Sequence, residues 1–221
     1  MLSRRIGLAG TAGFRLPARA AVQPASGKAY LDHLSPNTRQ QICRSIRLYA
    51  REGKLVAQRA RDVPEALRFL EELKELHQRT WTRRGETGSF AFPFFERFQR
   101  RLIATCLPRG TVEIIRVTCG ERVIGYLYNF VWRGTVLAYQ SGLAYEADAR
   151  LKPGLVAHCL AIDIHLAEGA MIYDFMAGEA RYKASLGLGA SARVRAPEPE
   201  ACPRAELEDR LAVSAGLGPD G

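Results

Sequence analysis

The chain has 221 residues, of which 47% are hydrophobic, and this length and composition are typical of one well-buried globular domain. Its net charge of +9 indicates anionic partners, such as coenzyme phosphates, nucleic acid, an acidic glycan or an anionic membrane face. Every apolar run is shorter than the roughly 18 residues that span a bilayer, which excludes a transmembrane helix.

The five cysteines are widely spaced, with no C-x-x-C pair and no histidine at ligand spacing. An odd, scattered set favours neither a disulfide framework nor a zinc site. We therefore expect a reducing compartment, a cytoplasmic protein and no bound metal.

Residues 1–29 contain several basic residues and no acid, but glycines interrupt every apolar run, so the apolar core of a signal peptide is missing. This pattern predicts a disordered basic tail, with a targeting segment as the alternative. Ser35 can then cap a helix that begins at Pro36. The helix is predicted over residues 35–52, with a basic stripe formed by Arg44, Arg47 and Arg51. That stripe is either a solvated face or a contact to phosphate or to another domain.

Residues 54–60 are predicted to form a short strand. Asp62 and Glu65 then have the spacing of a capping box, which predicts a helix that ends near Gly85. His77 lies on the apolar stripe of this helix and is interpreted as a structural histidine. Pro93 begins the next helix, with the following residues predicted inward: Phe94, Phe98, Leu102 and Cys106.

Three strands are predicted at residues 111–118, 122–131 and 135–142, and the short turns between them indicate an antiparallel meander. A helix from Pro153 to Gly169 follows, with its inward face predicted as Leu155, Leu160, Ile164 and Leu166. A strand over 171–176 comes after this helix and should therefore pair parallel with a neighbour.

A short helix over 179–186 and a final strand over 190–195 complete a predicted domain at residues 30–196. Residues 197–221 are rich in proline and acids and are predicted to be a disordered tail.

Ionisable residues gather where the 171–176 strand ends and the short helix begins. They are Asp174, Glu179, Arg181, Tyr182 and Lys183. Such a junction brings polar side chains and free helix N–H groups to the end of a sheet, which is a usual place for a ligand site. The alternative is an N-capped helix with solvated charges.

Four motifs carry a family resemblance: L-S-P-N-T-R at 34–39, L-H-x-x-x-W at 76–81, R-x-K-P-G at 150–154 and D-F-M-A-G-E-x-R-Y-K at 174–183. With the order of predicted elements, they resemble the CelD-like branch of the GNAT N-acyltransferases. That branch is associated with cellulose and exopolysaccharide synthesis and related to the FemAB peptidoglycan aminoacyltransferases. The resemblance covers residues 30–195 and implies an α/β fold, with a mixed, mostly antiparallel sheet flanked by helices.

Members of this branch usually carry a further GNAT-like half ahead of the part matched here, and the residues before Lys28 do not supply one. We therefore expect a truncated chain or one that works with a single lobe.

The resemblance implies that acetyl-CoA, or another acyl-CoA, binds where the third meander strand splays from the strand ending at Asp174. Tyr139 and Ser141 would lie along the pantetheine, whose amides would bond to unpaired backbone groups.

The pyrophosphate would lie at Arg150, Lys152 and Gly154, where glycine permits close approach and a helix N-terminus offers N–H groups. This loop departs from the usual Q/R-x-x-G-x-G/A, since Pro153 lacks a donor and Val156 replaces the second glycine. The alternative is a capped helix with adjacent basic residues.

The same resemblance implies that Tyr182 protonates the leaving thiolate and that Asp174 or Glu179 is the base. Arg181 and Lys183 would hold an anionic group of the substrate. Alternatively, these charges form structural ion pairs.

The expected function is transfer of an acetyl or other acyl group to an amine or hydroxyl of a sugar or cell-envelope precursor. One alternative is FemAB-like transfer from aminoacyl-tRNA to a peptidoglycan precursor, in which the basic helix at 44–51 binds RNA phosphates. The other is a non-catalytic remnant that binds a partner in a polysaccharide-synthesis complex.

Overall fold

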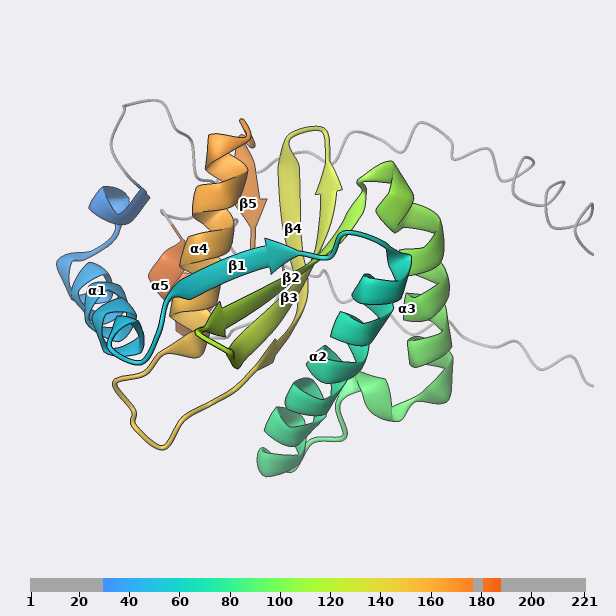
Figure 1. Cartoon of the computed structure of the whole chain (residues 1–221), viewed down its shortest axis with the longest axis horizontal. Helices are drawn as coiled ribbons and strands as arrows, with labels where there is room; N and C mark the ends of the chain where they lie inside the picture. The colour runs from blue at the N-terminus through green and yellow to red at the C-terminus, as the bar shows by residue number, and fades with distance from the viewer. Residues whose placement is uncertain (1–29, 177–180, 188–221) are drawn as a thin grey trace, which may run out of the picture. The chain divides into compact units, whose positions relative to one another are not determined.

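The computed structural model describes residues 30–176 and 181–187, and in these residues one five-stranded sheet has the order β1-β2-β3-β4-β5 (Figure 1). The strands are β1 (Leu55–Arg59), β2 (Val112–Cys119), β3 (Arg122–Trp132), β4 (Thr135–Leu143) and β5 (Ile172–Asp174). From β1 to β4, each strand pairs antiparallel with the next strand in the chain, whereas β5 pairs parallel with β4. The predicted meander and the predicted parallel strand are therefore confirmed.

Helices cover both faces of this sheet (Figure 1). They are α1 (Pro36–Ala50), α2 (Val63–Arg83), α3 (Pro93–Cys106), α4 (Pro153–Ala167) and α5 (Arg181–Leu186), with 3-10 turns at Tyr30–His33, Ser89–Ala91 and Leu107–Arg109. One buried cluster joins the sheet to α1, α4 and α5, and a second joins its other face to α2 and α3. None of the helices in this part of the chain is long and apolar enough to cross a membrane.

Local signals set the starts of the first two long helices. The Ser35 hydroxyl accepts a hydrogen bond from the Thr38 N–H at 3.2 Å, and the Asp62 carboxylate accepts one from the Glu65 N–H at 2.8 Å. Both predicted caps are thus confirmed. In a capping box the Glu65 carboxylate would accept a hydrogen bond from the N–H of the N-cap residue, Asp62. Here it accepts one from the N–H of Arg61, the residue before the N-cap, at 2.9 Å.

The predicted inward face of α3 is only partly right: Leu102 and Cys106 are partly buried and pack against the core, but the two phenylalanines do not. Phe94 is 73% exposed and Phe98 48% exposed, whereas Gln99 and Ile103 are buried. Gln99 Nε2 donates to the Tyr139 hydroxyl at 3.0 Å, so contact with the sheet decides which side of this helix is covered. Periodicity alone shows an apolar stripe but not what covers it.

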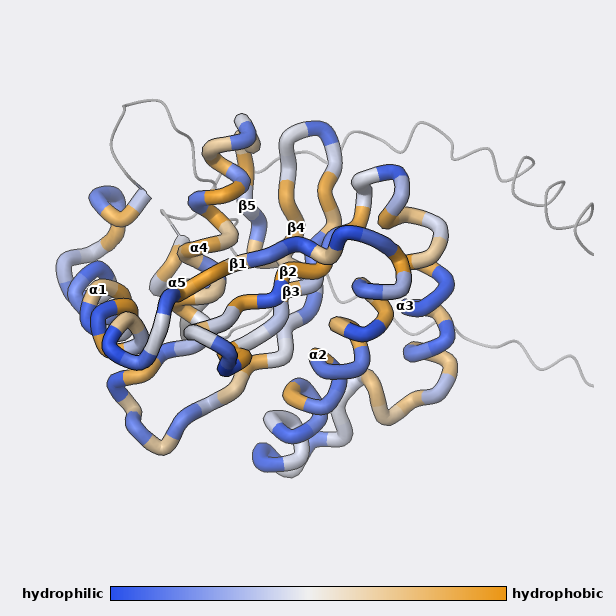
Figure 2. Tube along the Cα trace, in the orientation of Figure 1, coloured by the Kyte–Doolittle hydropathy of each residue, from blue (hydrophilic) through white to orange (hydrophobic). Residues whose placement is uncertain are grey.

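The predicted inward face of α4 is only partly right, because this helix is buried on most sides. Leu155 is buried as predicted, whereas Leu160, Ile164 and Leu166 are only partly buried. Most of the helix is hydrophobic (Figure 2), and it packs between the sheet, α1 and α5. The strand predicted over 171–176 is shorter, at Ile172–Asp174. The predicted tails, the final strand over 190–195 and the first residues of the short helix lie outside the described residues.

Helix α2 rests on β4 through a glycine. A Cβ at Gly142 would lie 2.9 Å from Cα of Leu73 and 3.0 Å from its carbonyl carbon, both of which are backbone atoms that cannot rotate away. Gly142→Ala is therefore expected to lower the free energy of unfolding by about 2–3 kcal/mol in urea titrations.

Gly154→Ala is the matched control for this prediction. Its added Cβ would meet only the end of the flexible Leu143 side chain, at 3.0 Å, so little loss of stability is expected. Equal effects of the two substitutions would contradict a close approach of α2 to the strand.

Candidate active site

β4 and β5 run together for only three residues. The register pairs Thr135 with Ile172, Val136 with Tyr173 and Leu137 with Asp174. β4 then continues through residues 138–143, bonded to β3 on one side but beyond the end of β5 on the other. Backbone groups on that open side can bond to an extended ligand.

Both strands are distorted at the point where they part. In β4 the register shifts beside Tyr139, because Tyr128 pairs with Gln140 while the next residue of β3 pairs with Ala138. At the end of β5, the Asp174 carboxylate accepts a hydrogen bond from the Met176 N–H at 2.7 Å, and Met176 has φ 57°, which is uncommon for a side chain other than glycine. This turn ends the pairing with β4.

The N-terminus of α4 lies next to the end of β4. Lys152 precedes the helix, and its backbone N–H donates to the Ser45 hydroxyl at 2.9 Å, but no side chain caps the helix. Pro153 has no N–H and the Val156 N–H donates to the Lys152 carbonyl at 3.0 Å, so the N–H groups of the first turn without a helical partner are those of Gly154 and Leu155, both in buried residues. A Cβ at Gly154 would lie 3.0 Å from a methyl group of Leu143, which places the start of this helix beside the end of the strand.

Arg150 is held by an acid two residues away. Its guanidinium donates to the Asp148 carboxylate, with Nη2 to Oδ2 at 2.7 Å and Nε to each oxygen at 3.0 Å. The hydrogen bonds from Arg150 lower the pKa of Asp148 to about 2. The arginine side chain is 61% exposed, so binding a phosphate would require only that it leaves or shares this partner.

The two candidate residues on β4 are placed differently. The Tyr139 ring packs edge-on against Tyr128, with centroids 5.5 Å apart, and its hydroxyl accepts the bond from Gln99. Its side chain therefore belongs to the core between the sheet, α2 and α3. Ser141 is half-buried on the stretch beyond β5 and pairs with Leu127 of β3.

Asp174 and Lys183 are brought together after β5. Asp174 is buried at the strand end, and Lys183 lies on α5, partly buried. Burial lowers the pKa of Lys183, while the charge of Asp174 acts in the opposite direction. Arg181 and Tyr182 also lie in α5, but their side chains, and all of Glu179, fall outside what the structure describes.

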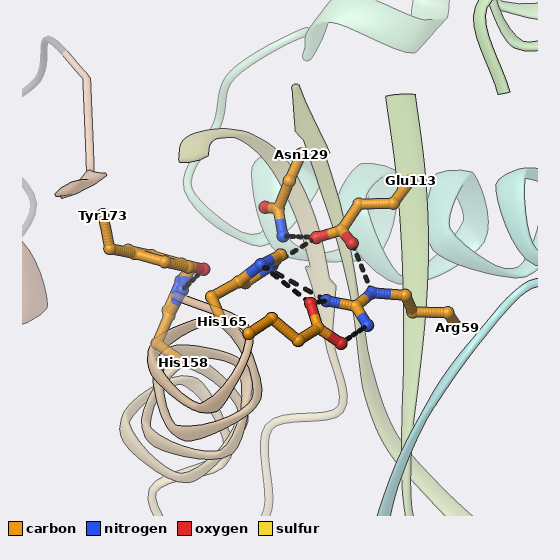
Figure 3. A network of polar contacts seen from close by, with 7 residues as sticks. Arg59, Glu113, Asn129, His158, His165 and Tyr173 are labelled. Carbon is orange, nitrogen blue, oxygen red and sulfur yellow. Dashed lines mark hydrogen bonds and ion pairs between the residues drawn. The ribbon is translucent and has the colours of Figure 1, made fainter. Parts of the chain in front are cut away.

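A buried polar network that the sequence did not indicate lies at the other end of α4 (Figure 3). The Glu113 carboxylate accepts hydrogen bonds from Arg59 Nε at 2.6 Å and Asn129 Nδ2 at 2.7 Å, and lies 2.6 Å from His165 Nε2. Arg59 also pairs with Glu168. The network borders a cleft of about 770 Å³ between β1, β2 and the end of α4.

Within the described residues, no group of three His, Cys, Asp or Glu could hold a metal.

This network predicts a pH-dependent stability. Burial alone would raise the pKa of Glu113, but the bonds with His165 and Asn129 and the charge of Arg59 outweigh it, so the pKa is lowered. A carboxylate whose pKa is lowered on folding stabilises the fold above its unfolded pKa, and this contribution is lost as the pH falls through the folded pKa.

Glu113→Gln is therefore expected to lower the free energy of unfolding by about 2–3 kcal/mol at neutral pH. The difference from the wild type should begin to shrink below about pH 4, where Glu113 of the unfolded chain becomes protonated, and should shrink further as the pH falls through the lower pKa of the folded protein. Urea titrations at both pH values measure it. A difference that stays constant with pH would contradict a role for the ionised carboxylate.

Two further histidines are buried, and burial favours the neutral form of each imidazole. His158 Nδ1 lies 3.0 Å from the Tyr173 hydroxyl, and burial, with Lys183 acting in the same direction, lowers its pKa to about 3. His77 packs against Phe90 and Trp81, and burial lowers its pKa as well. These contacts fit the interpretation of His77 as a structural histidine.

Comparison with known proteins gives one family and several similar folds. The family described as "Acetyltransferase (GNAT) domain" matches residues 36–184. The crystal structure of FemX is similar with a TM-score of 0.57 and 11% identity, and the match covers 79% of this chain and 60% of FemX. No curated protein matches the chain by sequence.

Two further solved structures show weaker similarity. The C-terminal domain of a putative lysylphosphatidylglycerol synthetase from Agrobacterium fabrum has a TM-score of 0.49 and 10% identity, over 77% of this chain and 50% of that one. L-PGS from Bacillus licheniformis has a TM-score of 0.48 and 15% identity, over 76% and 47%. The chain thus spans 60% of FemX and about half of each of these two structures.

Proposed function

The chain belongs to the acetyltransferase (GNAT) domain family, and from this premise we propose that it transfers an acyl group from acyl-CoA, with acetyl-CoA as the expected donor. The acceptor is an amine or hydroxyl of a sugar or cell-envelope precursor, in keeping with the CelD-like motifs. The observation that carries the proposal is the parting of β4 and β5 after Asp174, beside the uncapped N-terminus of α4.

In the proposed site, the backbone of residues 138–143 binds the extended arm of the donor and holds its carbonyl oxygen as negative charge develops. Tyr139 contributes through its backbone, since its side chain is part of the core. Ser141 lies on the same open stretch. Lys152, the first turn of α4 and an Arg150 released from Asp148 hold the phosphates.

The reaction needs two proton transfers from the chain's own residues. As the acceptor nitrogen or oxygen bonds to the thioester carbonyl carbon and the carbon–sulfur bond breaks, Asp174 or Glu179 takes the acceptor's proton, directly or through water. Tyr182 gives a proton to the departing thiolate. Arg181 and Lys183 hold an anionic group of the acceptor.

A second candidate is transfer from an aminoacyl-tRNA, as the FemAB relationship implies. The fold similarity to FemX and the exposed arginines of α1 favour it. Those arginines are Arg44 and Arg47 within the helix and Arg51 directly after it. In this case RNA phosphates would lie along α1, and binding would weaken strongly with salt.

Calorimetric titration separates these possibilities. Saturable binding of acetyl-CoA is the expected result. Salt-sensitive binding of tRNA without acetyl-CoA binding would favour the second candidate. Binding of neither would overturn both and leave a non-catalytic partner-binding domain.

A further inference from the structure

The outer face of α3 exposes aromatic side chains. Phe94 is 73% exposed, Phe98 48% and Phe92, which directly precedes the helix, 60%. The rings of Phe94 and Phe98 lie almost parallel, with centroids 6.4 Å apart. Leaving several large apolar side chains together in water is unfavourable, so such a group indicates a surface that binds something.

Arginines share this face. Arg97 and Arg101 follow Phe94 by three and seven residues, which places them on the same side of the helix, and both are exposed. Neither forms an ion pair within the described residues. Glu96, the one acid of α3, is instead bound on the side toward α2, by Lys74 at 2.6 Å. The outer face of α3 is therefore aromatic and cationic, without an acid.

The fold keeps this face outward. The opposite side of α3 is filled by buried Gln99 and Ile103, and Gln99 is bonded to Tyr139 of β4. Turning the helix to bury Phe94 and Phe98 would expose those residues and break that bond. Phe94 and Phe98, which the sequence pattern predicted to be inward, thus face solvent, and such local misfits are expected at functional surfaces.

We propose that the outer face of α3 docks on an anionic lipid surface. In helices that lie in a membrane interface, aromatic rings enter the boundary of the acyl chains while arginines contact anionic headgroups, and this face has both. The overall charge of +9 adds attraction to such a surface. None of the candidate catalytic residues lies on α3, so this proposal is independent of the acyl-transfer proposal.

Co-sedimentation of the full chain with lipid vesicles tests it. Binding is expected to vesicles of phosphatidylcholine mixed with an equal amount of phosphatidylglycerol, and far less to phosphatidylcholine alone. The double variant Phe94→Ala, Phe98→Ala should lower the partition coefficient by about tenfold or more. Arg97→Ala, Arg101→Ala should lower it by about tenfold on the anionic vesicles, as should added salt on the wild type.

Matched controls locate the docking face. Trp132→Ala removes a 59% exposed aromatic ring from the end of β3, and Arg44→Ala, Arg47→Ala removes two exposed charges from α1. Both controls should bind almost as the wild type does. All the substituted side chains are exposed, so thermal unfolding should change little.

Three results would overturn the proposal. The wild type could fail to bind anionic vesicles, or the control variants could weaken binding as much as the α3 variants do. Alternatively, sedimentation velocity could show self-association that Phe94→Ala, Phe98→Ala abolishes, without vesicle binding. A second copy of the chain would then cover this face.

Discussion

Replacing Tyr182 by phenylalanine is expected to lower the turnover rate of acyl transfer by about 100-fold or more, because general acid catalysis typically contributes that much. Affinity for acetyl-CoA should stay unchanged, since the hydroxyl acts on the departing thiolate rather than on the bound thioester. Release of free thiol, followed with a thiol reagent once an acceptor is in hand, measures the rate.

The pH profile gives a second readout for this variant. If Tyr182 is the acid, the wild-type rate should fall at high pH, where the phenol has lost its proton, and that fall should disappear in Tyr182→Phe. Tyr145→Phe is the control, because it removes a hydroxyl from a 48% exposed tyrosine in the loop after β4. An unchanged rate in Tyr182→Phe would show that the thiolate receives its proton from another group.

The double variant Arg150→Ala, Lys152→Ala is expected to weaken acetyl-CoA binding by about 100-fold. Each charge-assisted hydrogen bond to a phosphate contributes about 1.5–3 kcal/mol, and Arg150 contributes at the low end because it must leave Asp148. Calorimetric titration measures the loss. The affinity of the wild type should also fall with added salt, and that dependence should weaken in the variant.

Asp148→Asn tests the same site by changing the present partner of Arg150 instead of the arginine itself. If Arg150 exchanges Asp148 for a phosphate, then weakening its present partner should tighten acetyl-CoA binding by a few-fold. Unchanged binding in the double variant, or weaker binding in Asp148→Asn, would place the phosphates elsewhere.

Much of the fold followed from local signals in the sequence. Ser35 and Asp62 are good N-caps, and both cap their helices as predicted. The tight connections in the meander predicted antiparallel neighbours, and a helical connection into Ile172–Asp174 predicted a parallel one. These features depend on residues close together in the chain.

Features that depend on distant residues were not predicted. The network of Arg59, Glu113 and His165 joins residues more than fifty positions apart, and only the isolated acid in an apolar strand could have signalled it. The side of α3 that faces the sheet is likewise a tertiary choice, which is why Phe94 and Phe98 were misplaced.

In the candidate site, sequence reasoning placed a helix start beside Lys152 and a strand through Asp174, because both are local features, although the strand ends two residues earlier than predicted. It did not show that Arg150 is bound to Asp148 or that the Tyr139 side chain belongs to the core. Those outcomes depend on side-chain competition, which no spacing pattern reports. The roles of Glu179, Arg181 and Tyr182 stay predictions.

The proposed function depends on binding of the donor along the open side of residues 138–143 in β4. Hydrogen–deuterium exchange of the backbone amides, followed by mass spectrometry with and without saturating acetyl-CoA, tests it most directly. We predict slower exchange in peptides that cover 138–143 and the first turn of α4. Identical exchange in those peptides with and without acetyl-CoA would contradict the claim.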